Sequence, residues 1–429
     1  MKPATAFLTI LCTCLLLDPV GAEDVILKAS GKLRWHRGNM HTHSYWSDGD
    51  NFPEMIARWY REHGYQFLVF TDHNTLHNKE KWVDVGKIKN GEKAFASLGK
   101  AYPADWIVMR EIEGRKEVRL KTFDEVFRDV AEPQTYLLIQ GEEITDKYGK
   151  LPIHLCAANT DEMLPPLGGD SVTEVIQRNL DAVRARRERT GVRTMVHLNH
   201  PNFGYAVTAE QLMPIVGDQF FEVYNGHPGV HNSGDESHVS TERLWDIVNT
   251  FRRSEYHLPL MYGLATDDGH AYFETIPGKA SQPGRGWVMV LAESLTPDAI
   301  IEALEAGRFY SSSGVTLSSI QSSKTAMEVT VTPEAGLTYR IDFIGTREVF
   351  SRDSEPTVPD PAQEKLITRR YSDEIGAVLK SVEGTSGRYE FDGSEVYVRA
   401  VVTSSRIHPN PSEPGEFERA WVQPVAPGE

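Results

Sequence analysis

Short apolar runs that end in polar residues recur along the first 270 positions of the chain. Stretches with helical periodicity separate these runs. Strand, polar tip and helix in repeated order are typical of an α/β fold with a parallel sheet or barrel, whose chemistry gathers at the carboxyl ends of the strands. The expected strands are 66–70, 136–139, 194–198, 220–224 and 260–265, and the expected helices are 53–64, 123–131, 172–190 and 241–253.

The pattern changes after about residue 310, where short alternating runs replace the helical stretches. This alternation predicts a small antiparallel sheet or sandwich, and the segment 351–364, rich in Pro, Asp and Ser, is expected to be a surface loop. We therefore divide the chain into a domain over 30–314 and a β-rich C-terminal domain over 315–429. The expected C-terminal strands are 317–320, 326–332, 337–343, 389–391, 395–403 and 418–422.

The N-terminus has the three parts of a secretory signal peptide. Lys2 is followed by an apolar run over 7–17 and by the small-residue sequence Val20-Gly21-Ala22. We expect a signal peptide at 1–22, a secreted or periplasmic protein and no stable membrane span after cleavage. A retained anchor is the alternative. Cleavage would leave Cys156 as the single cysteine, which excludes an internal disulfide. Cys156 lies in the apolar stretch 153–158, which indicates a buried residue rather than a nucleophile.

The composition is that of a soluble globular protein, with 40% hydrophobic residues and a formal net charge of −16. This charge argues against a nucleic-acid-binding surface, because phosphate backbones require a basic face. It does not exclude a small anionic substrate, since bound metal ions supply local positive charge.

Fourteen of the fifteen histidines precede residue 271. His41 and His43 would lie on the same face of a strand, where both imidazoles can bind one metal ion. The potential ligands exceed what one four-coordinate ion uses, which predicts two or three divalent ions (Mn, Fe or Zn). Taken singly, Asp48 could be a turn former, His154 a core residue and Asp267 an orienting group. The full predicted ligand set is His41, His43, Asp48, His73, Glu143, His154, His200, Asp268 and His270.

The ordered motifs over residues 34–314 resemble those of the polymerase and histidinol phosphatase (PHP) superfamily. The resemblance implies a distorted (β/α)7 barrel with a trinuclear metal site, and family members mostly hydrolyse phosphoesters. The motifs are Gly38-Asn39-Met40-His41-Thr42-His43, Ser47-Asp48-Gly49, Thr71-Asp72-His73-Asn74, Gly141-Glu142-Glu143-Ile144, His200-Pro201-Asn202, Asp267-Asp268-Gly269-His270 and Gly307-Arg308-Phe309-Tyr310.

The resemblance also implies how the ligands are shared. His41, His43, Glu143 and Asp268 resemble the ligands of one metal. Glu143 would bridge to a second metal bound by His154 and His200, and Asp48, His73 and His270 resemble the third set. Glu143 is preferred to Glu142 because Gly-x-Glu-Ile is the family pattern. Four further residues are catalytic candidates: Glu222 and Asn225 for orienting ligands or substrate, and His197 or His227 for protonating the leaving group, with His197 alternatively orienting a neighbour.

The long segment 78–133 carries Arg110, Arg115 and Arg119, which either reach an anionic substrate or form a solvated face. An exported chain with a trailing β domain resembles the branch that includes secreted carbamate hydrolases. The predicted activity is phosphomonoester or phosphodiester hydrolysis by metal-bound hydroxide. The alternatives are a carbamate, ester or amide hydrolase on the same cluster, and a non-catalytic periplasmic metal- or ligand-binding protein.

Overall fold

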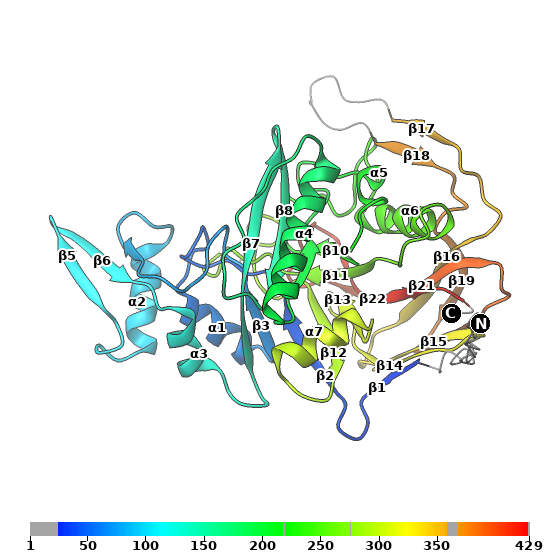
Figure 1. Ribbon diagram of the computed structural model, residues 1–429. Helices are drawn as coiled ribbons and strands as arrows, with labels where there is room; N and C mark the ends of the chain where they lie inside the picture. The colour runs from blue at the N-terminus through cyan, green and yellow to red at the C-terminus, as the bar shows by residue number, and fades with distance from the viewer. Residues whose placement is uncertain (1–24, 218, 275, 358–367, 428–429) are drawn as a thin grey trace, which may run out of the picture.

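A sheet of thirteen strands runs through the molecule (Figure 1). The computed structural model describes residues 25–217, 219–274, 276–357 and 368–427, so the predicted signal peptide lies outside the described residues. In spatial order the strands are β11 (Tyr262–Thr266), β10 (Phe220–Asn225), β9 (Met195–Leu198), β8 (Leu151–Ala158), β7 (Leu137–Tyr148), β3 (Phe67–Phe70), β2 (Arg34–Asn39), β12 (Trp287–Ala292), β13 (Phe309–Ser312), β22 (Phe417–Val425), β21 (Glu395–Ile407), β16 (Tyr339–Arg347) and β19 (Ala377–Glu383).

The sheet is mixed, whereas the sequence pattern predicted a parallel one. Strands β2, β3 and β7 are parallel neighbours, and so are β9, β10 and β11. Between these two blocks, β8 runs antiparallel to both β7 and β9. The apolar run 136–139 was expected to end before the acidic pair, but β7 continues to Tyr148 and turns back through Gly149, which has a φ of 60°. The missed element is therefore a long hairpin.

The sheet curls until its first strand, β11, lies beside β13 and β22. The Gln423 side chain accepts a hydrogen bond from Gly263 N at 2.8 Å and donates one to Gly263 O at 3.0 Å. Ala265 N donates to Ser311 Oγ at 3.0 Å. Because side chains rather than a strand ladder make this return, the predicted closed (β/α)7 barrel is not confirmed.

Besides α2 (Gly91–Ala101), which is described below, six helices are present among the described residues, and the four predicted ones are confirmed to within two residues at each end. Their ends follow ordinary capping rules: Thr122 and Glu125 form a capping box, and Gly191 ends a helix with a φ of 71°. Within the described ranges, no helix has the length and apolar character needed to cross a membrane. The helices are α1 (Pro53–Glu62), α3 (Phe123–Val130), α4 (Val172–Thr190), α5 (Ala209–Leu212), α6 (Thr241–Ser254) and α7 (Pro297–Glu305).

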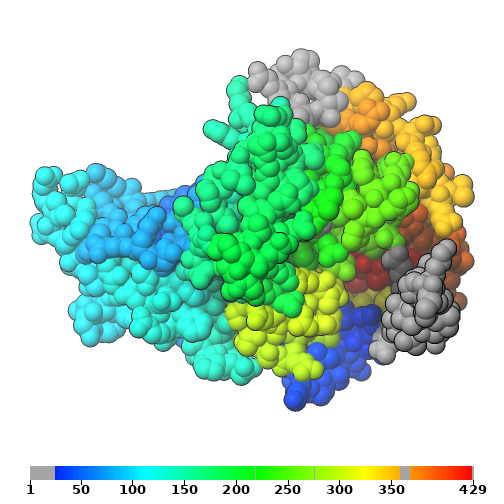
Figure 2. All heavy atoms as spheres, viewed as in Figure 1, coloured from blue at the N-terminus to red at the C-terminus, as the bar shows by residue number. Residues whose placement is uncertain are grey.

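Segment 78–133 forms a lobe of its own, drawn in blue to cyan at one side of the molecule (Figures 1 and 2). It contains α2 (Gly91–Ala101), an antiparallel sheet of β4 (Trp82–Asp84), β6 (Arg115–Arg119) and β5 (Met109–Ile112), and the helix α3 at its end. A separate hydrophobic core, which includes Trp46 and Leu98, holds the lobe against the rest of the chain.

The C-terminal part is an antiparallel sandwich, as its alternating pattern predicted. A four-stranded sheet of β1 (Val25–Lys28), β14 (Leu317–Ser322), β15 (Ala326–Val331) and β20 (Ser386–Glu390) packs on the end of the large sheet. Met327 and Val329 face Ile341 and Phe343 in one core. The predicted loop contains β17 (Ser354–Pro356), paired with β18 (Arg369–Tyr371), and residues 358–364 lie outside the described ranges. Because β13 pairs with β22, the large sheet continues across residue 314.

Candidate metal centre

The nine predicted ligands come together at one end of the two parallel blocks. His41 and His43 follow β2, His73 follows β3, His200 follows β9, and Asp268 and His270 follow β11. Glu143 and His154 lie within the β7–β8 hairpin, and Asp48 lies in the loop before α1. The carboxyl ends of parallel strands lie at the same edge of a sheet, which explains why residues more than 200 positions apart meet at this site.

The first group joins two histidines to two carboxylates. His41 Nε2 lies 3.4 Å from Glu143 Oε1 and 3.3 Å from Asp268 Oδ1. His43 Nε2 lies 3.4 Å from Glu143 Oε2 and 3.2 Å from the same Asp268 oxygen. Asp268 has a φ of 47°, a conformation that residues other than glycine adopt rarely and that is often found at functional sites. The two imidazoles therefore face one pair of carboxylates, although they follow β2 rather than lie on a strand.

Glu143 is the centre of the second group. Its Oε1 lies 3.0 Å from His154 Nδ1 and 3.4 Å from His200 Nε2, and its Oε2 lies 2.6 Å from His73 Nδ1. Asn199 Nδ2 also donates a hydrogen bond to Oε1 at 2.7 Å. Both oxygens of one buried carboxylate thus face ligand groups, as a bridging ligand requires.

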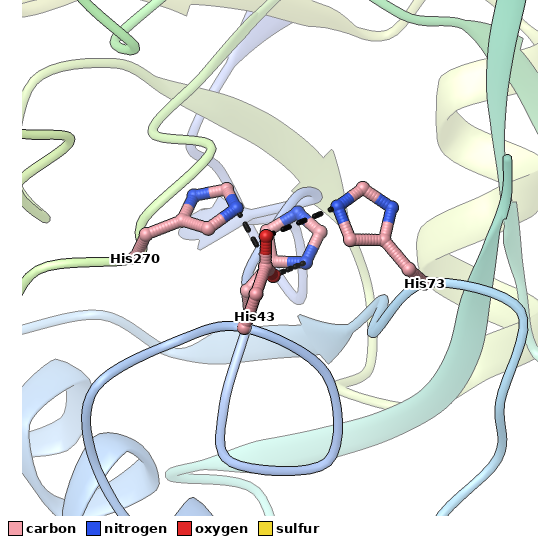
Figure 3. Close-up of side chains that lie close together, drawn as sticks. His43, His73 and His270 are labelled. Carbon is pink, nitrogen blue, oxygen red and sulfur yellow. Dashed lines mark ion pairs between the residues drawn. The ribbon is translucent and has the colours of Figure 1, made fainter. Parts of the chain in front are cut away.

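The third group surrounds Asp48. Its carboxylate lies 3.7 Å from His43 Nδ1, 3.6 Å from His73 Nε2 and 3.3 Å from His270 Nε2. Figure 3 shows the three imidazoles, which come from different loops, turned toward one another. The Asp48 side chain is 57% exposed, so this group lies at the solvent side of the cluster.

The electrostatic environment keeps the carboxylates in the ionised form that binds metals. Burial would raise the pKa of Asp268, but His41, His43 and His270 hold that pKa well below its ordinary value. The pKa of Glu143 is likewise well below its ordinary value, because His41, His154 and His73 outweigh its burial. Burial, together with His270 and His73, lowers the pKa of His43 to about 4, which leaves a neutral imidazole.

These residues fit divalent metal ions. His41 Nε2 and His43 Nε2 are buried and make no hydrogen bond to any described residue. Buried polar atoms of this kind require a partner, and imidazole and carboxylate suit Mn, Fe and Zn. Ligand atoms lie within 4.8 Å of one another in three relevant sets, and His43, His73 and Glu143 each belong to two of them. The sets are His41, His43 and Glu143; His73, Glu143 and His154; and His43, Asp48, His73 and His270.

Glu222 and Asn225 on β10 lie behind the ligands. Glu222 Oε1 accepts hydrogen bonds from His41 Nδ1 at 2.7 Å and from Thr266 Oγ1 at 2.8 Å. Its Oε2 accepts from His200 N and from Asn225 Nδ2, each at 2.8 Å. Asn225 Nδ2 also donates to Asp268 Oδ2 at 3.1 Å. Such partners fix the orientation of metal-binding side chains.

The two predicted proton donors occupy different positions. His197 is completely buried, with its Nε2 3.5 Å from Glu222 Oε1, and it forms a close group with His41 and Cys156. This position favours the alternative in which His197 orients a neighbour. His227 is half-buried at the rim, where its ring centroid lies 5.7 Å from that of His270. Cys156 is buried and free, as expected.

Several supporting residues were not predicted. Asp72 accepts hydrogen bonds from Ser44 N, Ser47 Oγ and His77 Nε2, which ties the loop after β2 to the loop after β3. Asn199 supports Glu143, as described above. The sequence signals were available, because Asp72 and Asn199 each immediately precede a predicted ligand, but adjacency in sequence does not show which atoms they contact.

Asp267, left open as an orienting group, accepts hydrogen bonds from Tyr60 OH at 2.8 Å and from Arg285 N at 2.6 Å. It therefore anchors the strand end that carries Asp268.

The arginines of segment 78–133 form ion pairs within their own lobe. Arg110 pairs with Glu117 at 2.7 Å and stacks on Trp82. Arg115 pairs with Glu113 at 3.1 Å, and Arg119 pairs with Glu125 at 2.6 Å. These contacts favour the solvated-face alternative over direct contact with a substrate.

No protein-family model and no curated protein matches this chain. Solved structures that are similar to it include the following three. A two-domain protein from Bacteroides vulgatus, which contains a predicted PHP-like metal-dependent phosphoesterase, is 13% identical, with 91% of this chain and 96% of that chain covered and a TM-score of 0.39. A protein from Bifidobacterium adolescentis assigned as a metal-dependent phosphoesterase is 14% identical, with 62% and 95% covered and a TM-score of 0.30.

PsfC from Pseudomonas syringae is 12% identical, with 60% of this chain and 82% of that chain covered and a TM-score of 0.31. The structures that this chain resembles at low identity thus include PHP-like metal-dependent phosphoesterases.

Proposed function

We propose that this chain is a metal-dependent hydrolase of the PHP superfamily that cleaves phosphoesters. The observation that carries the proposal is the sharing of Glu143 and His43 between neighbouring ligand groups. A bridging carboxylate between adjacent cation positions is what a site with two or three ions needs, whereas a protein that only sequesters one ion does not need it.

Divalent ions bound there would activate water for attack and polarise the scissile bond. The chain's own residues have distinct roles in this proposal. His41, His43 and Asp268 would hold one metal ion, and Glu143 would bind both this ion and the next. Glu222 sets the orientation of His41 through the 2.7 Å hydrogen bond to Nδ1.

Charge balance supports an anionic substrate. The ligand set contains three carboxylates, those of Asp48, Glu143 and Asp268. Three divalent ions would leave an excess of positive charge, which favours binding of a phosphate group and stabilises the charge that develops during its transfer. Two ions would leave a smaller excess of positive charge. Binding of a metal ion at the Asp48 group would therefore favour an anionic substrate over a neutral one.

A carbamate or carboxylester substrate is the second candidate. Arg110, Arg115 and Arg119 form ion pairs within their own lobe. They do not bind a phosphate from there, and this favours a substrate without a phosphate group. The same proposal includes a PHP-type barrel, export of the protein and binding of Mn, Fe or Zn. The curled sheet edge at β11 is consistent with a barrel.

The proposal is tested by hydrolysis assays on the purified chain, with bound metal measured on the same sample. The substrates are p-nitrophenyl phosphate, bis(p-nitrophenyl) phosphate and an aryl N-methylcarbamate, each with and without added manganese. We expect phosphoester turnover that rises with metal content. Turnover of the carbamate alone would favour the second candidate. Bound metal with no turnover on the panel would favour the non-catalytic binding protein.

A further inference from the structure

His227 is held by its own turn in a defined way. Its backbone N–H donates to Asn225 Oδ1 at 2.7 Å, which connects it to the residue that also contacts Asp268. Gly229 N–H donates to His227 Nδ1 at 2.9 Å. An imidazole nitrogen that accepts a backbone N–H carries no proton, so the ring proton of His227 is on Nε2. No hydrogen bond to Nε2 is present among the described residues, and the ring is half-buried.

Gly229 is required for this arrangement because of close approach. A Cβ at position 229 would lie 3.0 Å from Nδ1 and 3.0 Å from Cε1 of His227. The imidazole therefore packs directly on the glycine backbone. A methyl group at this position would push the His227 ring by a few tenths of an ångström and strain the hydrogen bond that fixes its tautomer.

The ring lies beside the ligand cluster, at the rim. It contacts His270 edge-on, and the Phe203 ring lies 5.8 Å from it and 5.2 Å from the ring of His200. His227 thus contacts the ligand histidine His270 directly and is joined to His200 through Phe203. A substrate bound to both ligand groups would therefore lie close to this ring.

We propose that His227 is a catalytic hydrogen-bond donor, whose neutral Nε2–H binds an oxygen of the substrate that does not leave. This inference rests on the proposed hydrolase function, and it differs from the sequence-based expectation that His227 protonates the leaving group. Delivery of a proton by an imidazolium would require a second ring proton on Nδ1, which the Gly229 N–H opposes. A fixed donor aimed at developing charge assists reaction without transferring a proton.

Three variants test the role by kinetics. His227→Phe keeps a ring but removes the donor, and we expect kcat/KM to fall by about 10- to 1000-fold. His227→Gln keeps an N–H near the position of Nε2, and its loss should be at least several-fold smaller. Gly229→Ala keeps the donor but shifts the ring, so we expect a loss of activity smaller than that of His227→Phe. Bound metal should be unchanged in all three, and wild-type kcat/KM in His227→Phe would overturn the proposal.

A series of aryl phosphates with leaving groups of different pKa separates the donor from a general acid. A donor to an oxygen that stays gives the same fold-loss in His227→Phe across the series. A loss that grows as the leaving group becomes more basic would identify a general acid and overturn the proposal.

A readout independent of activity is the ¹⁵N NMR spectrum of zinc-loaded protein labelled at histidine, with the His227 signal assigned by its absence from His227→Gln. We expect the Nε2–H tautomer in wild type and its loss or broadening in Gly229→Ala. An Nδ1–H tautomer would overturn the donor while leaving the proposed hydrolase intact. Conversely, failure of wild type to hydrolyse any panel substrate would reject the hydrolase, whatever tautomer the spectrum shows.

Discussion

Glu222 and His41 form a buried carboxylate–histidine pair, with Glu222 Oε1 2.7 Å from His41 Nδ1. Both side chains are completely buried. His41 and His197 outweigh the effect of burial and hold the pKa of Glu222 well below its ordinary value, so the carboxylate is ionised and His41 Nδ1 is the donor. The other ring nitrogen, Nε2, lies beside Glu143 and Asp268, where it would offer its lone pair to a bound metal ion.

Replacing Glu222 with Gln should weaken metal binding by about 10- to 100-fold, with a parallel loss of activity. The amide cannot accept all the hydrogen bonds that the carboxylate accepts from His41, His200 N and Asn225. Equilibrium metal titration of the purified variant measures the change. Thr266→Val removes one neutral donor to the same carboxylate and should have a smaller effect. Unchanged affinity in Glu222→Gln would show that His41 does not depend on this pair.

Replacing Asp48 with Asn should remove one equivalent of metal and leave the others. Asp48 contacts only the outer group of His43, His73 and His270, and its exposure means that the fold should tolerate the change. Metal stoichiometry by elemental analysis provides the measurement. Glu92→Gln, an exposed change on α2, is the control and should keep every equivalent. Loss of all metal in Asp48→Asn would mean that the outer group is not a separate position.

The stability of the fold should depend on pH through Glu54. Burial raises the pKa of Glu54 to about 7, with Trp106 Nε1 donating to its Oε1 at 3.1 Å. The folded chain keeps a proton that the unfolded chain loses near pH 4.5, so this residue's contribution to stability falls as the pH rises from there to about 7.

We therefore expect Glu54→Gln to raise the free energy of unfolding at pH 8 by up to about 3 kcal/mol, with the gain vanishing near pH 4.5. Urea unfolding at several pH values measures it. Glu62→Gln changes an exposed carboxylate of the same helix and should give no such trend. A gain that is equal at both pH values would contradict the assignment to Glu54.

Breaking the Asp246–Arg399 pair should weaken the attachment of the sandwich to α6. Arg399 Nε and Nη2 donate to the two Asp246 oxygens at 2.7 and 2.8 Å, and Tyr397 OH donates to Oδ1 at 2.7 Å. Asp246→Asn leaves a buried guanidinium without its main partner, which costs about 3–5 kcal/mol. Urea unfolding should show this loss, whereas Asp181→Asn on the exposed face of α4 should change stability by less than about 0.5 kcal/mol.

Periodicity predicted four of the seven described helices and about half of the strands, because the apolar residues of these elements are buried. All four residues of Phe67–Phe70 are buried, and the same holds for Met195–Leu198. The pattern could not predict the direction of β8. The burial pattern of β8 resembles that of a parallel strand. The hairpin depends on a turn at Gly149, and a glycine in a turn is equally common in surface loops that form no hairpin. The pairing of β1 with β14 was also missed, since a four-residue strand at the chain start has no distinctive spacing.

The candidate site could be predicted further than the fold around it, because ligand chemistry restricts residue type. His41 and Glu143 are recognisable by type and spacing, and the structure brings them together. The roles of Asp72, Asn199 and Gly229 depend on hydrogen bonds between segments or on close approach, which spacing does not encode. Whether the nine residues bind metal stays a prediction.

The most direct test compares bound metal and hydrolysis in Glu143→Gln and Glu142→Gln. The two residues are adjacent on β7, but Glu143 faces the histidines, whereas Glu142 accepts a hydrogen bond from Leu164 N at 2.6 Å on the other side. Elemental analysis and phosphoester assays on the same samples should show that Glu143→Gln loses metal and activity together, while Glu142→Gln keeps both. Full metal content and full activity in Glu143→Gln would contradict a bridging carboxylate and, with it, the proposed centre.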